Sequence, residues 1–572
     1  MSDVLKWRLT VAGCAFVLAV VMIMPQVLHQ ISPLYKGVPI GLNSDEAIYL
    51  ARVQESLSGR PQLSAEAFTG HPGLVGTQDA FIEAWYGRLF QWTGWIAADV
   101  LNVMDAVVPV LIFLSIVLFF RLCGFSRKAA LGGAAAFCII ELYSLNRPIH
   151  MRASFFLMLW SLIGIVYALR SRWWGAVIGG GLLGLLIGIY FWSFSFAWAF
   201  WGIFFAWELL EWGYGKWQEH EKIAHSKIRR ALHTAWGVLW HLRPRRPTWQ
   251  PQRWHILAIV GLFGLACGMP AIANLVNMTL HPLYEYGSFR SGMHPGRTPE
   301  SWAYSVIFFG MVVSLFVALR ENYEELRPYR SVCVLILAAF VYMNQQFVHG
   351  ITFNFVSHGI FSLAISAVGM VLLYHAVRSR ALAVGAVAAC VYLAAIGYDG
   401  RFVMGQWQVS EGRFANQHLA DALDVLDELP RSRILSDTGT QAFIAAHTRH
   451  DIVYSIYLKN VLMSHYELAS RLCLTMLPLR PDKRMISERM HLVYPDAVSA
   501  FGGDTRQQEE ELVFAACREL DLDPNISIRT YEVSHIFWNK REEPDWNVSR
   551  LRMDLEEVAS GETWVLYKIN EA

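Results

Sequence analysis

Charged residues are scarce in this chain. Asp, Glu, Lys and Arg make up 17% of its 572 residues, whereas a soluble domain carries about a quarter. Hydrophobic residues make up 54%, and the mean hydropathy is +0.32. The shortage of charge excludes an ordinary soluble enzyme and predicts a polytopic α-helical membrane protein.

Several functional motifs are also absent from the sequence. It contains no P-loop and no dinucleotide fingerprint, and none of its 8 cysteines forms a CxxC pair that would suggest a zinc or redox motif. The 48 Lys and Arg residues balance 47 Asp and Glu residues, so no net charge points to a nucleic-acid partner. Cys473 and Cys517 both fall in a polar tail, where a disulfide and two free thiols are equally open.

Long apolar runs dominate the first two thirds of the chain. Runs of about 20 residues are needed to cross a bilayer as a helix. Eleven such spans are predicted near 9–29, 103–120, 128–145, 152–169, 173–190, 191–210, 255–275, 302–319, 331–348, 357–377 and 381–398. Lys6 and Arg8 precede the first run, which is too long for a signal-peptide core and is interpreted as an uncleaved anchor.

The basic residues orient these spans. The N-terminal segment and the predicted cytoplasmic loops together hold 21 Lys and Arg residues, whereas the opposite loops hold 8. Since cytoplasmic loops carry the excess of positive charge, the N-terminus is predicted to be cytoplasmic. An odd number of spans then places the C-terminus outside, in a multi-pass protein of the inner or plasma membrane.

Three polar segments stand out from the spans. The first outer loop, 31–102, is acidic and longer than a connector requires. The cytoplasmic loop 213–254 mixes Trp with Lys and Arg, which is typical of an amphipathic segment on anionic lipid. The tail predicts an outer α/β domain, 399–572, that follows a transmembrane module, 1–398. Strands are expected in the tail at 434–435, 452–457, 491–494, 526–538 and 563–569, and helices at 414–429, 441–446 and 509–519.

The segment 43–59 carries the strongest functional pattern. It begins a few residues after the first span, so Asp45 and Glu46 are expected near the outer membrane face. A helix that starts at this point places Tyr49 one turn after Asp45, with Arg52 beside Tyr49. The same acids also make a favourable helix start, so both capping and catalysis remain open.

A second pair of acids lies later in the same loop. Asp79 and Glu83 are one turn apart if their segment is helical. They could take part in substrate binding or simply form a solvated face.

The run Asp-Glu-Ala-x-Tyr at 45–49, followed by Leu-x-Gly at 57–59, resembles the first outer loop of GT-C fold glycosyltransferases. It looks most like the lipid A aminoarabinose transferases, with protein O-mannosyltransferases and oligosaccharyltransferase subunits as more distant resemblances. The match in sequence covers 43–59, whereas the long first loop, many spans and outer C-terminal domain extend it in architecture to the whole chain.

This resemblance implies an enzyme. It would transfer a sugar from a polyprenyl-phosphate donor to a glycan, lipid or protein acceptor at the outer face, with inversion at the anomeric carbon. Asp45 would be the general base, and Glu46 its neighbour and substitute. Tyr49, Arg52, Asp79 and Glu83 would contribute to substrate binding.

The departing lipid phosphate requires cations on the same side of the membrane. The turn 146–152 carries Arg147, His150 and Arg152, and positive charge on the outer side is disfavoured unless it has a partner or a function. These residues are therefore predicted to bind phosphate, with contact to outer-leaflet lipid as the competing interpretation. The loop 276–301 offers a second set, in which Arg290 and Arg297 would bind phosphate and His294 would bind substrate.

Oligosaccharyltransferases pair their first-loop acid with an acidic motif in the next outer loop and with a Trp-Trp-Asp motif in the soluble domain. Neither occurs at the corresponding place here, so a divalent metal is doubtful and no metal ligand is assigned. The alternatives are a transporter or flippase of lipid-linked or polysaccharide substrates, and a polysaccharide polymerase or ligase. Few charges within the spans and no repeat between halves argue against the transporter. The early Asp45-Glu46 pair argues against the polymerase, whose catalytic loop comes late in the chain.

Overall fold

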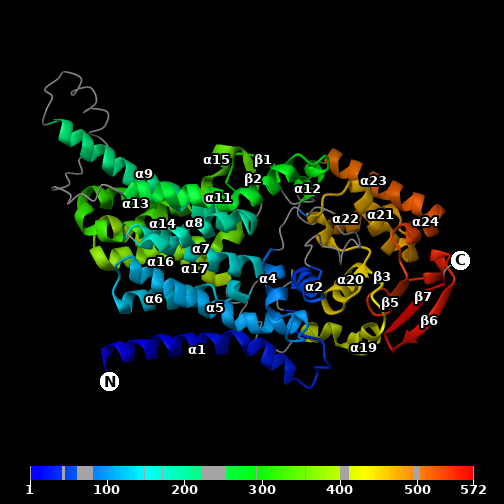
Figure 1. Cartoon of the computed structure of the whole chain (residues 1–572). Helices are drawn as coiled ribbons and strands as arrows, with labels where there is room; N and C mark the ends of the chain where they lie inside the picture. The colour runs from blue at the N-terminus through cyan, green and yellow to red at the C-terminus, as the bar shows by residue number, and fades with distance from the viewer. Residues whose placement is uncertain are drawn as a thin grey trace.

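The computed structural model describes residues 2–41, 46–60, 76, 81–146, 149–170, 172–221, 253–290, 293–299, 301–353, 356–399, 411–493 and 503–570. It consists of a bundle of long helices and a C-terminal part with a small sheet at its far end (Figure 1). Two helices of the first outer loop, α2 (Glu46–Leu57) and α4 (Phe81–Phe90), lie between these parts.

Each of the eleven predicted spans falls on a helix of the bundle. These helices are α1 (Asp3–Gln30), α5 (Ala97–Leu122), α6 (Arg127–Ile140), α7 (Ile149–Ala168), α8 (Trp173–Leu185), α9 (Phe191–Glu221), α11 (Arg253–Thr279), α13 (Trp302–Leu326), α14 (Arg330–Asn344), α16 (Ile360–Val377) and α17 (Arg380–Asp399).

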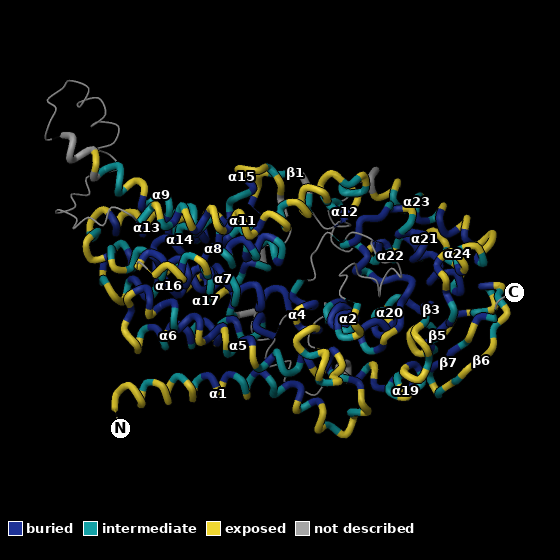
Figure 2. The backbone as a smooth tube through the Cα atoms, viewed as in Figure 1, coloured by how far each residue is buried: buried dark blue, intermediate teal, exposed yellow. Residues whose placement is uncertain are grey.

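The predicted number of spans is not confirmed. Among the described residues, eight helical stretches are long and apolar enough to cross a membrane. One of them, Trp302–Asn344, contains both α13 and α14, which pack against each other with the ring centroids of Phe309 and Phe340 6.0 Å apart. The 14 residues of α6 and the 13 residues of α8 fall short of the length that a full span needs. The chain is nevertheless a multi-pass membrane protein. Much of the surface of α1 is exposed, as expected for a helix that faces lipid (Figure 2).

Glycines allow α7, α8 and α11 to pack closely. A Cβ atom at Gly164 would lie 2.4 Å from the backbone nitrogen of Gly179, and one at Gly184 would lie 2.2 Å from the carbonyl oxygen of Gly264. No larger residue fits at either crossing, which is the usual reason for small residues between membrane helices.

The C-terminal part is a mixed α/β unit, in agreement with the fold predicted for the tail. Its sheet has the strand order β4-β3-β5-β7-β6. The strands are β3 (Arg433–Leu435), β4 (Asp451–Ile452), β5 (His535–Asn539), β6 (Leu555–Ser560) and β7 (Trp564–Ile569). Strand β3 is parallel to β4 and β5, whereas β7 is antiparallel to β5 and β6.

Helices account for most of the remaining C-terminal part. They are η5 (Glu411–Leu419), α19 (Ala420–Glu428), α20 (Thr438–His447), η6 (Ile456–Asn460), α21 (His465–Met476), α22 (Lys483–Val493), α23 (Gly503–Leu522) and α24 (Pro524–Thr530).

Three of the strands expected in the tail need correction. Residues 491–493 end α22, because Ile486, Met490 and Val493 form one buried helical face. The run 526–538 divides into the end of α24 and strand β5, and the run 452–457 extends as a strand only to Ile452. Strand β6 was not expected, because its mostly exposed residues lack an apolar alternation.

Helix α2 belongs to two hydrophobic cores. Leu50 and Val53 pack into the core of the bundle, whereas Ile48 and Ala51 pack into the core of the C-terminal part. Apolar side chains on both faces of a short helix fix it between its two neighbours. The predicted catalytic segment is therefore held by both parts of the protein.

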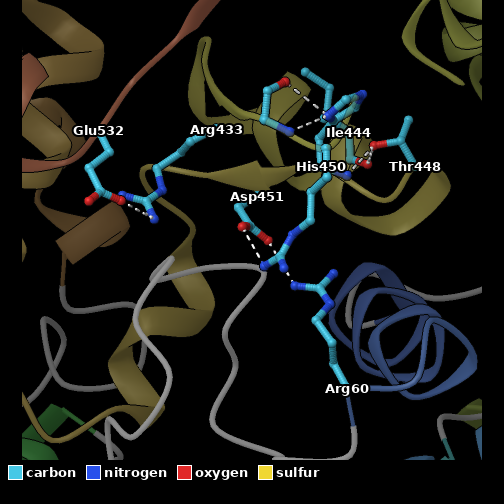
Figure 3. A network of polar contacts seen from close by, with 9 residues as sticks. Arg60, Arg433, Ile444, Thr448, His450, Asp451 and Glu532 are labelled. Atoms are coloured by element: carbon cyan, nitrogen blue, oxygen red, sulfur yellow. Dashed lines mark hydrogen bonds and ion pairs between the residues drawn. The ribbon is translucent and has the colours of Figure 1, made fainter. Parts of the chain in front are cut away.

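Ion pairs continue this contact beyond the end of α2 (Figure 3). Arg60 Nη1 lies 3.1 Å from Asp451 Oδ1, and Arg431 Nη2 lies 2.6 Å from Asp451 Oδ2. Because the Asp451 side chain is largely buried, this pairing is screened less by salt than a surface pair would be.

Cys473 in α21 and Cys517 in α23 form a disulfide, with their Cα atoms 4.9 Å apart. The bond closes a loop of 44 residues and ties two helices of the C-terminal part together. A disulfide of this kind persists in an oxidising compartment.

Replacing both Cys473 and Cys517 with serine should lower the free energy of unfolding of the C-terminal part by about 2–4 kcal/mol, because the unfolded chain gains the freedom of the opened loop. Denaturant unfolding under non-reducing conditions measures the change. Serine at Cys267, which is a free cysteine, is the control and should have little effect. Detection of both thiols as free in the denatured, unreduced protein would contradict the bond.

His450, the residue before Asp451, is held in its neutral form by its hydrogen bonds (Figure 3). Its Nδ1 accepts from the backbone N–H of Ser432 at 3.1 Å, so its Nε2–H donates to the carbonyl oxygen of Leu426 at 2.7 Å. A second proton on Nδ1 would oppose the Ser432 donor. Burial lowers the pKa of His450 below its ordinary value of 6.5.

The C-terminal part should lose stability as the pH falls below 6.5, because His450 then takes up a proton in the unfolded chain before it does so in the folded protein. Burial also lowers the pKa of His447, to about 4, which acts in the same direction. Thermal unfolding between pH 7.5 and pH 4.5 would measure the slope. The variant His450→Gln should be less stable at pH 7.5 but less dependent on pH, and an unchanged slope would contradict the assignment.

Candidate functional site

A buried carboxylate, Glu83, joins three segments at the end of the bundle next to the C-terminal part. Its Oε1 lies 3.3 Å from Arg52 Nη1, and its Oε2 lies 2.7 Å from His150 Nε2. Arg52 comes from α2, Glu83 from α4 and His150 from the first turn of α7. All three side chains are almost completely buried.

A second ion pair joins α5 and α7. Arg152 pairs with Asp105, and its Nη1 donates to the carbonyl oxygen of Leu145 at 3.1 Å. Gln26 of α1 donates through Nε2 to Asp105 Oδ2 at 2.7 Å. Together with Arg52, Glu83 and His150, these residues form what we call the outer ionic cluster, after the side of the membrane predicted for it from the sequence. It is composed of Gln26, Arg52, Glu83, Asp105, His150 and Arg152.

The start of α2 adjoins the outer ionic cluster. Glu46, the first residue of α2, is close enough to attract Arg152 electrostatically. The ring centroid of Tyr49 lies 5.4 Å from that of His150. Asp45 lies outside the described residues and immediately precedes Glu46 in the chain.

The electrostatics of Glu83 follow from its partners. Burial raises the pKa of this carboxyl, but the neighbouring His150 and Arg52 outweigh burial and hold the pKa below its usual value. Glu83 is therefore ionised in the folded protein at neutral pH. A charge so far from water is tolerated only with partners of this kind.

Several buried polar atoms of this region lack a hydrogen-bond partner within the described part of the chain. They are Gln26 Oε1, Arg52 Nε, Tyr86 Oη, His150 Nδ1 and Arg152 Nε. Buried polar groups are normally hydrogen-bonded, so these atoms are where hydroxyl or phosphate groups of a substrate could be bound. Burial, with smaller effects from neighbouring charges, raises the pKa of the Tyr86 hydroxyl to about 12, which keeps it a neutral donor.

Close packing of α2 on α4 fixes Glu83. A Cβ atom at Gly87 would lie 2.2 Å from Ser56 Cβ, so only glycine permits this approach. Ser56 also donates its hydroxyl to the carbonyl oxygen of Ala84 at 3.1 Å. Glu83 lies one helical turn before Gly87, and the contact holds it against Arg52.

The predicted site residues divide into three groups. Glu46, Tyr49, Arg52, Glu83, His150 and Arg152 lie in or beside the outer ionic cluster. Asp45, Asp79 and Arg147 lie outside the described residues. The third group lies in or near the loop 276–301 and contacts other segments: Arg290, His294 and Arg297.

Arg290, the last residue of α12 (Tyr284–Arg290), is buried against the C-terminal part. Its Nη1 donates to the carbonyl oxygen of Met463 at 2.8 Å and its Nη2 to that of Val461 at 2.6 Å. These bonds give Arg290 a role in joining the loop 276–301 to the C-terminal part. Its predicted role in phosphate binding remains a prediction.

The other two residues of that loop lie near a short hairpin. His294 belongs to β1 (Met293–Pro295), which pairs with β2 (Ile351–Phe353), and its side chain is not among those described. The exposed Arg297 donates through Nη1 to the carbonyl oxygen of Phe347 at 2.7 Å.

Sequence reasoning missed Asp105, Gln26 and Tyr86. A signal was available for Asp105, because an acid within an apolar run is costly in a membrane and marks a functional or paired position. Gln26 and Tyr86 carry no comparable signal, since a single amide or phenol is common near the ends of membrane helices. Within the described residues, no group of three or more His, Cys, Asp and Glu side chains could hold a metal ion.

Comparison with known proteins gives similarity at the level of structure only. No protein-family model matches the chain, and no curated protein matches it. Among solved structures, the mycobacterial arabinofuranosyltransferase AftD matches at 13% sequence identity with a TM-score of 0.48, covering 99% of this chain and 40% of AftD. Two classes of an AftD mutant match at 13% and 12% identity with TM-scores of 0.44. The chain thus spans about two fifths of the AftD chains that it matches.

Substituting Glu83 with glutamine should lower the free energy of unfolding by about 3–5 kcal/mol, because it leaves Arg52 buried without a compensating charge. Thermal unfolding in lipid nanodiscs measures the loss. The matched control Glu285→Gln changes an exposed glutamate of another outer segment and should lie within about 0.5 kcal/mol of the parent. Equal stability of the two variants would contradict the role of the Glu83 ion pairs.

Proposed function

We propose that this protein is a membrane glycosyltransferase that moves a sugar from a polyprenyl-phosphate donor to an acceptor hydroxyl at the outer face. The observation that carries the proposal is the position of α2. Its first turn brings Glu46 within electrostatic reach of Arg152 and the ring of Tyr49 close to that of His150. A carboxylate near buried cationic groups is suited to this transfer.

The reaction is an inverting displacement. Asp45 takes the proton from the acceptor hydroxyl, and the hydroxyl oxygen then forms a bond to the anomeric carbon of the sugar. The bond from that carbon to the phosphate oxygen breaks, and polyprenyl phosphate leaves with the electron pair. Glu46 is the neighbouring carboxylate and the substitute base, and Tyr49 and Arg52 help to orient the acceptor.

The negative charge that develops on the leaving phosphate requires donors that are already in place. Arg147 supplies a positive charge, and Arg152 Nε supplies an N–H group, since this atom is buried without a partner in the described residues. His150 is assigned to the same phosphate as Arg152. Asp105 and Glu83 hold these two side chains in place. Arg290, Arg297, His294 and Asp79 are assigned to the more distant parts of the donor and acceptor, and no metal is proposed.

The orientation of the protein is part of the proposal. The disulfide between Cys473 and Cys517 supports an oxidising environment for the C-terminal part. With a cytoplasmic N-terminus, α1 then leads to an outer face on which α2, the outer ionic cluster and the C-terminal part lie together. We place this face on the extracytoplasmic side of the inner or plasma membrane.

Asp45→Asn in nanodiscs should lower the turnover of a polyprenyl-phosphate sugar by about a hundred-fold to ten-thousand-fold, because the acceptor hydroxyl loses its base. The measurement is release of polyprenyl phosphate from a panel of such donors in the presence of acceptor glycans. Glu46→Gln should reduce turnover less, and a double variant at both positions should abolish it.

The control for this experiment is Asp99→Asn, an exposed acid of the same outer loop, which should retain the parent rate. Full turnover by Asp45→Asn would remove Asp45 as the base. Donor movement across vesicles without any release of polyprenyl phosphate would favour a flippase instead.

A further inference from the structure

Helix α4 and the turn that follows it expose an apolar surface next to the bundle. Trp92 is 80% exposed, Trp85 57% and Leu89 53%. Trp95 and Ile96 are exposed as well. We call these five residues the α4 surface. Several exposed large apolar residues within one short segment mark a site of interaction.

The α4 surface has little charge. From residue 84 to residue 98 the chain carries no acid, and Arg88 is its one charged side chain. Trp85 and Leu89 are four residues apart in α4, which places them on one side of the helix. Trp92 follows in the turn, and its indole contacts the backbone of Leu89. Tryptophan with an adjacent arginine is typical of segments at a membrane–water interface.

The polar edges of this surface are largely satisfied within the protein. The indole Nε1 of Trp92 donates to the carbonyl oxygen of Leu89 at 2.7 Å. Trp95 stacks on Phe90, with ring centroids 5.5 Å apart. The Trp92 indole therefore adds apolar area to the surface without requiring a hydrogen-bond partner outside the chain.

We propose that the α4 surface rests in the outer leaflet of the bilayer, with lipid as its partner. Its continuity with the lipid-facing surface of the bundle supports lipid over a protein. Ile96 directly precedes α5, a candidate membrane span, along which Val107, Leu111 and Leu114 are exposed.

The end of α1 extends the same interface. Ile31 and Leu34, immediately after this span, are exposed and apolar. Together with the start of α5, they place apolar side chains of two neighbouring spans at one end of the bundle.

The opposite face of α4 holds the outer ionic cluster. Glu83, Tyr86 and Gly87 are buried on that side, and Trp85 and Leu89 are exposed on the other. Because a short helix is rigid, the depth at which the α4 surface rests in lipid also sets the depth of Glu83. The bilayer therefore helps to fix the position of Glu83, together with Arg52 and His150.

The test uses a fluorescent probe on the full chain in liposomes of phosphatidylethanolamine and phosphatidylglycerol. The free cysteines that are not buried, Cys14, Cys267 and Cys390, are first replaced by alanine. A single cysteine then carries the probe in Trp85→Cys or Trp92→Cys. Leu522→Cys, an exposed apolar position in the C-terminal part, is the matched control.

Lipids brominated near the top of the acyl chain should quench the probes at positions 85 and 92 about three-fold more strongly than aqueous iodide does. The reason is that interfacial segments lie within about 10 Å of the headgroup boundary. The probe at position 522 should show the reverse order. Retention of the parent elution volume and of the disulfide shows that each variant is folded. If either tryptophan variant fails this check, Arg88→Cys carries the probe at the same surface.

Iodide quenching at positions 85 and 92 equal to that at 522, without quenching by brominated lipid, would overturn the proposal. Self-quenching between labelled chains that disappears on dilution with unlabelled protein would also overturn it, because it would identify a second copy of the chain as the partner. Neither measurement depends on sugar transfer, so its outcome is independent of the proposed enzymatic activity.

Discussion

A negative charge with no access to water determines how helices α2, α4 and α7 come together. Glu83 can remain ionised only while Arg52 and His150 face it. These partners come from different segments, so α2, α4 and α7 must meet at one point for the fold to be stable. The Arg152–Asp105 pair imposes the same requirement on α5 and α7, and Gln26 extends it to α1.

The C-terminal part is integrated with the membrane bundle through α2. Ile48 and Ala51 of this helix complete the C-terminal core, whereas Leu50 and Val53 complete the bundle core. Arg60 and Arg290 add polar contacts from two different outer loops. In consequence, a rearrangement of the C-terminal part would move the segment to which we assign the acceptor base.

The elements that depend on local sequence were predicted well, and those that depend on distant partners were not. Apolar runs located every helix of the bundle, because hydrophobicity over about 20 residues is a local property. The predicted number of spans is not confirmed, because α6 and α8 are shorter than a full span needs.

The contacts between segments left no comparable mark on the sequence. Glu83 and His150 are 67 positions apart, and nothing in the local sequence of either residue identifies the other. The short strands of the tail were equally difficult. Residues 491–493 were expected in a strand but end α22, whose buried face packs in the surrounding core.

The contact made by Arg290 limits amino-acid substitution differently on its two sides, the loop 276–301 and the C-terminal part. Its guanidinium binds the carbonyl oxygens of Val461 and Met463, and every amino acid supplies such an oxygen. Positions 461 and 463 can therefore exchange side chains, within the limits of packing, without losing these bonds. Lysine could not replace Arg290 in the same way, because its single ammonium lacks the planar fork that reaches both acceptors. The contact therefore requires an arginine side chain at position 290, whereas at positions 461 and 463 it requires only the backbone conformation.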